Sequence, residues 1–116
     1  MKKIIINEFM EMTSGKVLIS LQELLTKLDT ESVKFWSFRD ITLTYPSPFG
    51  ISVLDFESLS RNLSIGFLVS AEDFRVFLKS DFQIIDGCIN GYTERIDIEP
   101  IITIECVDST QWEIST

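Results

Sequence analysis

Two short segments of this 116-residue chain carry the signals of an amphipathic helix, whereas most of its other apolar segments have the composition of β-strands. The first helix signal is the capping box of Ser20 and Glu23, in which each side chain satisfies a backbone N–H group at the helix start. Leucines follow at positions 21, 24, 25 and 28, which is helical spacing. We expect this helix to end near Asp29 and Thr30.

The second helix is expected at Ala71–Ser80. Ser70 and Asp73 repeat the capping pattern, and phenylalanines at positions 74 and 77 supply an apolar stripe. Acidic residues lie in its first turn and Lys79 lies in its last turn, which matches the helix dipole.

The expected strands are the segments rich in β-branched and aromatic residues. They are Lys3–Phe9, Val33–Tyr45, Ile51–Phe56, Leu63–Val69, Phe82–Ile89, Tyr92–Ile98, Ile101–Val107 and Gln111–Ser115. The segment Ile51–Arg61 is ambiguous between a strand and a short helix, and we favour a strand at Ile51–Phe56 followed by a turn at Leu59–Asn62. This order predicts an α+β fold in a single domain, residues 1–116, with a largely antiparallel sheet and two amphipathic helices packed on one face.

Turns and breaks separate these elements. Asn90-Gly91 is the strongest hairpin signal, because both residues tolerate positive φ. Arg39-Asp40 is a point where the second strand can be interrupted. The remaining breaks are expected at Met10–Gly15, Tyr45–Gly50, Leu59–Asn62, Pro100 and Asp108-Ser109.

Negative charge is concentrated in the last part of the chain. Ten of the eighteen acidic residues lie between Ala71 and Thr116, with only three of the ten basic residues, so this part carries 3 − 10 = −7 of the net charge of −8. Such a balance disfavours nucleic acid and anionic membrane surfaces as partners. It favours a basic protein partner, with a solubility role for the charge as the alternative.

Strand alternation indicates where the acidic side chains point. In the last two strands Ile102, Ile104, Cys106, Trp112 and Ile114 form the inward set. If the last three strands are neighbours, the outward side chains lie together on one open sheet face. This face carries Asp97, Glu99, Glu105 and Glu113, and Asp108 lies in a turn at its rim. We predict that these five residues bind a basic partner, with a merely solvated acidic face as the alternative.

A proline-stiffened loop offers two aromatic side chains, Tyr45 and Phe49. Such residues lose little entropy on binding, so they are candidate apolar anchors for a partner. The alternative is that both side chains fold back onto the core.

The residue types needed for common catalytic and metal sites are missing. The chain has no histidine to activate a serine or cysteine nucleophile. Cys88 and Cys106 lack metal-ligand spacing, and we find no phosphate loop, calcium loop or distinctive carboxylate pair. We therefore expect no catalytic residues, no metal site, no cofactor and no enzymatic activity. No apolar run is long enough to span a membrane, so a cytoplasmic protein is expected.

In size, acidity and lack of a catalytic set, the chain resembles the small bacterial immunity proteins that neutralise toxins, many of them nucleases. This resemblance implies stoichiometric binding, in which the acidic face covers the basic substrate cleft of a toxin. Two alternatives remain: an accessory or regulatory subunit that self-associates, and a small carboxylate-dependent enzyme.

Overall fold

The computed structural model describes residues 3–12, 15–44, 48–80, 82–94 and 99–116, and for residues 10–12 and 15–17 only the backbone is described. Its main element is a six-stranded sheet in the order β1-β8-β7-β6-β4-β5, in which every neighbouring pair is antiparallel. The strands are β1 (Lys3–Ile6), β4 (Phe35–Thr44), β5 (Phe67–Ser70), β6 (Gln83–Tyr92), β7 (Ile102–Val107) and β8 (Gln111–Ser115). A separate hairpin pairs β2 (Phe9–Met12) with β3 (Gly15–Leu18). The α+β fold with an antiparallel sheet is confirmed.

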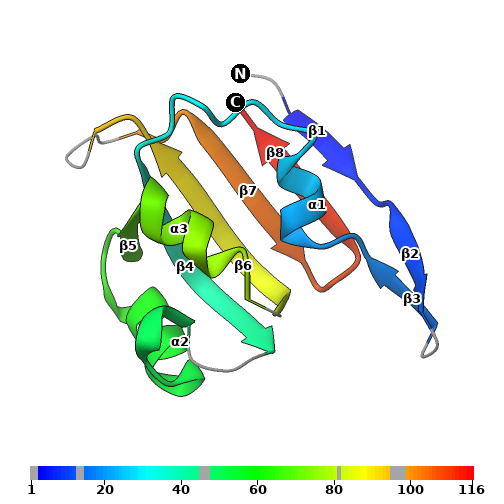
Figure 1. Ribbon diagram of the computed structural model, residues 1–116, viewed down its shortest axis with the longest axis horizontal. Coiled ribbons are helices and arrows are strands. Elements are labelled where there is room, and N and C mark those ends of the chain that lie inside the picture. Colours follow the sequence, from blue (N-terminus) through cyan, green and yellow to red (C-terminus); the bar gives the residue numbers. More distant parts are fainter. Residues whose placement is uncertain (1–2, 13–14, 45–47, 81, 95–98) are drawn as a thin grey trace.

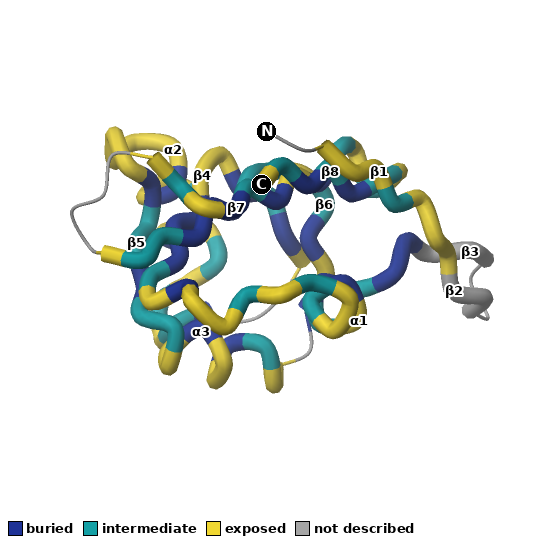
Figure 2. The backbone as a smooth tube through the Cα atoms, turned by 90° about the horizontal axis from the view of Figure 1, so that it is seen from above, coloured by how far each residue is buried: buried dark blue, intermediate teal, exposed yellow. Residues whose placement is uncertain are grey.

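Helices cover one face of this sheet. Helices α1 (Leu21–Leu25) and α3 (Ala71–Phe77) lie on the same face, and α2 (Val53–Asn62) lies at the edge next to β4 (Figures 1 and 2). A 3₁₀ turn, η1 (Pro48–Gly50), precedes α2. Helices α1 and α3 are the two predicted ones, although both end earlier than expected. In the part of the chain that the structure describes, no helix is long and apolar enough to cross a bilayer.

The core between the sheet and the helices is rich in aromatic side chains. Trp36 of β4 stacks on Phe74 of α3 with ring centroids 4.5 Å apart, and Phe77 stacks on Phe82 at 4.2 Å. Burial of each such side chain is worth roughly 1.5–3 kcal/mol. Trp112 is also buried, and its indole Nε1 donates to the carbonyl of Ile19 at 2.9 Å, so β8 is joined to the segment that leads into α1.

Three helices begin with the same cap. The hydroxyls of Ser20, Ser52 and Ser70 each accept a hydrogen bond, at 3.1 Å, from the backbone N–H three residues later. The cap at Ser52 starts α2, so the predicted strand at Ile51–Phe56 is wrong. Its β-branched and apolar residues suggested a strand, but Phe56 and Ser60, four residues apart, form the buried side of a helix.

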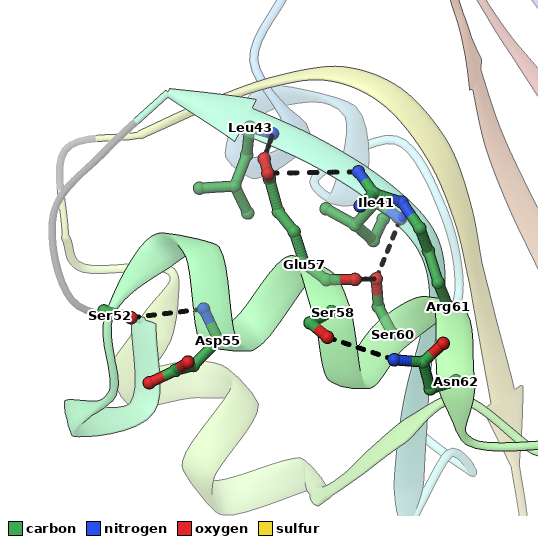
Figure 3. Close-up of polar contacts among 9 residues, drawn as sticks. All are labelled: Ile41, Leu43, Ser52, Asp55, Glu57, Ser58, Ser60, Arg61 and Asn62. Atoms are coloured by element: carbon green, nitrogen blue, oxygen red, sulfur yellow. Dashed lines mark hydrogen bonds and ion pairs between the residues drawn. The ribbon is translucent and has the colours of Figure 1, made fainter.

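Helix α2 lies at the sheet edge because it completes the hydrogen bonds of β4. Strand β5 pairs only with the first part of β4, and beyond it Asp40 has a φ of 51° and the pairing register shifts. The predicted interruption at this position is therefore confirmed. Past it, the Ser60 hydroxyl accepts from the N–H of Ile41 and the Glu57 carboxylate accepts from the N–H of Leu43, each at 3.1 Å (Figure 3).

The predicted hairpin at Asn90-Gly91 is wrong, because β6 runs straight through both residues. Gly91 is needed there for close packing: a Cβ atom on it would lie 2.7 Å from Ile102 and 3.0 Å from Val33. Thr93 and Glu94 lie outside any strand, and positions 95–98 of the predicted strand Tyr92–Ile98 lie outside the described residues.

The first predicted strand also differs in detail. Lys3–Phe9 divides into β1 and the start of β2, and the predicted break at Met10–Gly15 is wrong because β2 and β3 pair across it. The predicted strand Leu63–Val69 begins only at Phe67. The predicted strands Val33–Tyr45, Ile101–Val107 and Gln111–Ser115 hold to within two residues, whereas Phe82–Ile89 continues further, to Tyr92. Asp108-Ser109 forms the expected turn between β7 and β8.

A candidate protein-binding face

No described helix covers the sheet face opposite α1 and α3, and we call this surface of β1, β8, β7, β6 and β4 the open face (Figure 2). Direct cross-strand partners share one side of a sheet, so two rows of side chains cross it. The charged row consists of Ile5, Glu113, Glu105, Cys88 and Arg39, each opposite the next. The polar row consists of Lys3, Ser115, Thr103, Asn90 and Ser37. Its last two members are buried, because the segment before β5 covers this part of β4 and the Ser37 hydroxyl donates to the carbonyl of Ile65.

The predicted neighbours Glu105 and Glu113 lie at the centre of the charged row. They are direct partners between β7 and β8. The side chains predicted to point inward from β7 and β8 are all buried, on the opposite side of the sheet. They are Ile102, Ile104, Cys106, Trp112 and Ile114. Glu105 is exposed and Glu113 is half-buried. Two like charges placed this way repel each other mildly, which is a cost that folding alone does not require.

A cation from the first strand modifies this pair. Lys3 Nζ lies 2.7 Å from Glu113 Oε1, and Gln111 Nε2 donates to Glu113 Oε2 at 2.9 Å. The hydrogen bond from Lys3, with that from Gln111, lowers the pKa of Glu113, and the same bond to Glu113 raises the pKa of Lys3. Among the described residues, no cation lies within ion-pair distance of Glu105, although its charge contributes to raising the pKa of Lys3.

Two more acidic residues, Asp86 and Asp108, are in contact where β7 ends. In the β7–β8 turn, Asp108 and Ser109 have φ values of 47° and 58°, a conformation that short polar side chains tolerate. The N–H of Asp108 donates to Asp86 Oδ1 at 3.3 Å, and the N–H of Ser109 donates to the carbonyl of Ile85 at 2.8 Å. Asp86 was absent from the predicted set, because its place beside this turn depends on β6 being the neighbour of β7.

The other predicted residues do not join this group. Glu99 is exposed in the loop before β7, at the opposite end of that strand from Asp108. Asp97 and Tyr45 lie outside the described residues. Phe49 stacks on Phe77 of α3 at 4.8 Å, so it lies on the helix side of the sheet. This packing matches the alternative in which Phe49 folds back onto the core.

The other end of the charged row has the opposite sign. Arg39 of β4 is exposed and lies opposite Cys88, which in turn lies opposite Glu105. Burial, and to a lesser degree the charge of Glu105, raises the pKa of the Cys88 thiol to about 11. Burial likewise raises the pKa of Cys106 to about 11. Both thiols are therefore protonated at neutral pH and are poor nucleophiles.

The helix side of the sheet also has a cavity. A cavity of about 520 Å³ lies between η1 and α3, lined mainly by apolar side chains. Its lining includes Phe49, Phe77 and Phe82, and Asp73 is the one charged residue among the described residues that line it. One carboxylate without a second acid or base is not an acid–base pair. Among the described residues, no three His, Cys, Asp or Glu side chains are grouped in a way that would hold a metal ion.

Comparison of the chain with protein-family models, with curated proteins and with solved structures finds no match. The fold defines an α+β domain with a helix-covered antiparallel sheet, and its other face carries an ordered set of charges. The case for a function therefore rests on the geometry and charge of the open face.

Proposed function

We propose that the chain is a non-enzymatic binding domain whose open face binds a basic protein. The observation that carries this proposal is the position of Glu105: it is exposed beside Glu113 at the centre of the open face and has no ion-pair partner among the described residues. A basic side chain of a partner would relieve the repulsion between the two carboxylates. Binding of the partner would therefore remove the electrostatic cost of placing Glu105 beside Glu113.

The pattern of charges also constrains the partner. The charged row changes from two carboxylates at Glu113 and Glu105 to a guanidinium at Arg39. The partner that fits is therefore basic opposite the carboxylates and acidic, or a hydrogen-bond acceptor, opposite Arg39. Asp108 and Asp86 extend the negative charge at one end of β7, and Glu99 extends it at the other. Such complementarity speeds association and disfavours wrong partners.

We further propose that the partner is a bacterial toxin, and that the chain acts as its immunity protein. This is supported by the net charge of −8, the absence of histidine and the small size, which together resemble small acidic immunity proteins. In this mode the acidic face covers a basic cleft that otherwise binds nucleic acid, and neutralisation is stoichiometric. Catalysis and a cofactor are not needed for this role.

The test compares the wild type with two charge reversals of equal size. Glu105→Lys changes the centre of the open face, and Glu72→Lys changes an exposed acid on α3, on the helix side. Each protein is used as bait in an extract of the source cells at ~50 mM and ~500 mM salt, a range over which exposed charges become strongly screened. The retained protein is then produced with each variant, and growth of the host is measured.

The expected result is one basic protein that is retained at low salt, weakened at high salt, toxic alone and neutralised at one-to-one ratio. Glu105→Lys abolishes retention and protection, and Glu72→Lys preserves both. A partner whose affinity and salt dependence are unchanged by reversing both Glu105 and Glu113 would contradict the acidic-face model. A toxic partner neutralised equally well by Glu105→Lys would do the same.

A further inference from the structure

The outer edge of β1 has backbone groups that no described strand pairs with. Strand β1 is the first strand of the sheet and, among the described strands, pairs only with β8 (Figure 1). Its sequence is Lys-Ile-Ile-Ile, which has high β propensity. Natural edge strands are usually protected by proline, a bulge, several charges or a covering element. In β1 the pairing with β8 is regular over four residues, and Lys3 is its one charge.

Exposed apolar side chains follow the same edge. Ile5, on the open face, is 56% exposed, and Ile4, on the helix face, is 38% exposed. Phe9, where β2 begins, is 45% exposed. The opposite edge of the sheet differs, because β5 runs directly into α3 at Ser70 and contacts α2. The edge of β1 is therefore the one that combines free backbone groups with apolar side chains on both faces.

We propose that the edge of β1 pairs with the same strand of a second copy of this chain, in antiparallel register centred on Ile5. A two-fold axis perpendicular to the sheet keeps each face on the same side in both copies. Ile5 then lies opposite its own counterpart on the open face, and Ile4 lies opposite Ile6 on the helix face. Apolar side chains meet apolar side chains on both faces, and the backbone groups of each edge are satisfied by the other.

Local charge at β1 is compatible with a second copy and favours this register. Each copy has a net charge of −8, so two copies repel except where their acids are distant or paired. Near β1, Glu113 is paired with Lys3 and Glu8 is paired with Lys27. With the axis at Ile5, Lys3 lies opposite Asn7, which is uncharged. With the axis at Ile4, Lys3 would instead lie opposite Ile5, which is the less favourable pairing.

The pairing extends the sheet to twelve strands and places two open faces side by side. It does not depend on what the open face binds. One short strand per copy is a small contact, below the roughly 1,200 Å² typical of stable complexes. We therefore expect a reversible dimer with a dissociation constant of micromolar order or weaker.

Sedimentation equilibrium of the purified chain from ~5 µM to ~500 µM tests the proposal. The wild type should shift with concentration from its 13.3 kDa monomer mass towards twice that value. Ile5→Lys places like charges across the axis and should weaken dimerisation at least tenfold, and its ammonium group can pair with the adjacent Glu113 without harm to the fold. Leu54→Lys, at a 75% exposed position on α2, is the matched control and should dimerise as the wild type does.

A charge swap tests the register. Ile5→Glu alone should be monomeric like Ile5→Lys, but an equimolar mixture of the two should recover the dimer, because opposite charges then meet across the axis. A mass independent of concentration in the wild type would overturn the proposal and leave the edge for a strand of another protein. Dimerisation that survives Ile5→Lys, or that the mixture fails to recover, would overturn it as well.

Discussion

Glu105 and Glu113 are direct cross-strand partners on the open face, yet only Glu113 has a cation within ion-pair distance among the described residues. The two carboxylates thus differ in role although they are equivalent in the strand pattern. Glu113 is engaged with Lys3 and Gln111 and joins β8 to β1. Glu105 has no ion pair among the described residues.

Replacing Lys3 by methionine should raise the pKa of Glu113. The hydrogen bond from Lys3 is the main cause that holds this pKa below its ordinary value, and the bond from Gln111 remains in the variant. Titration of the side-chain carboxyl carbons by NMR measures the change. A pKa of Glu113 that is unchanged in Lys3→Met would contradict the pairing.

The same pair gives a pH window for stability. The pKa of Glu113 is lowered in the folded state, so its contribution is present above the unfolded pKa and is lost as pH falls through the folded value. The pKa of Lys3 is raised, so its contribution is present below the unfolded pKa and is lost as pH rises through the folded value. Urea titrations should therefore show any difference between wild type and Lys3→Met at neutral pH, and none below the pKa of Glu113.

Replacing Ser60 by alanine should lower the free energy of unfolding by about 1–3 kcal/mol, because the buried N–H of Ile41 loses its acceptor. Ser58→Ala on the same helix is the control. Its hydroxyl is exposed and accepts only from Asn62, so a change within about 0.5 kcal/mol is expected. Equal losses in the two variants would show that α2 does not complete the edge of β4 in the way Figure 3 depicts.

Two glycines with similar φ values separate backbone strain from steric contact. Gly50 has a φ of 78° with open space around it, so Gly50→Ala should cost only the roughly 1–2 kcal/mol of a left-handed alanine. Gly66 has a φ of 83°, and a Cβ atom there would lie 2.6 Å from the carbonyl oxygen of Phe38. Gly66→Ala should therefore destabilise the protein more than Gly50→Ala in denaturant unfolding. The reverse order would contradict the close packing of this loop on β4.

The helix starts and the final hairpin followed from local chemistry. A serine that caps a backbone N–H acts over three residues, and the alternation of buried and outward side chains in Ile102–Val107 and Gln111–Ser115 requires only that one face be buried. The pairing of Glu105 with Glu113 was therefore predictable, since a short turn joins their strands. The same capping rule applied to Ser52 would have found α2.

The remaining features depend on contacts between distant parts of the chain. Lys3 reaches Glu113 because β1 adds to the sheet beside β8, and nothing local to either residue indicates this pairing. Asn90-Gly91 resembles a turn, but partners on both sides, Ser37 and Thr103 for Asn90, hold it extended. Tertiary pairing thus overrode the local turn preference.

The position of Cys88 beside Glu105 in the charged row predicts that its rate of alkylation depends on pH and on the charge of Glu105. Burial is the main reason that its pKa is about 11, and the charge of Glu105 adds to the effect. At neutral pH the thiolate fraction is small, so alkylation by iodoacetamide should be slow and should rise about tenfold per pH unit until the pKa is approached. Glu105→Gln removes the neighbouring charge and should speed the reaction at Cys88, whereas Glu72→Gln on α3 should not.

Peptide mass spectrometry assigns the modified cysteine, since Cys106 is buried and should react only on unfolding. Equal rates in the two variants would mean that Glu105 does not lie beside Cys88, and the charged row would have to be redrawn.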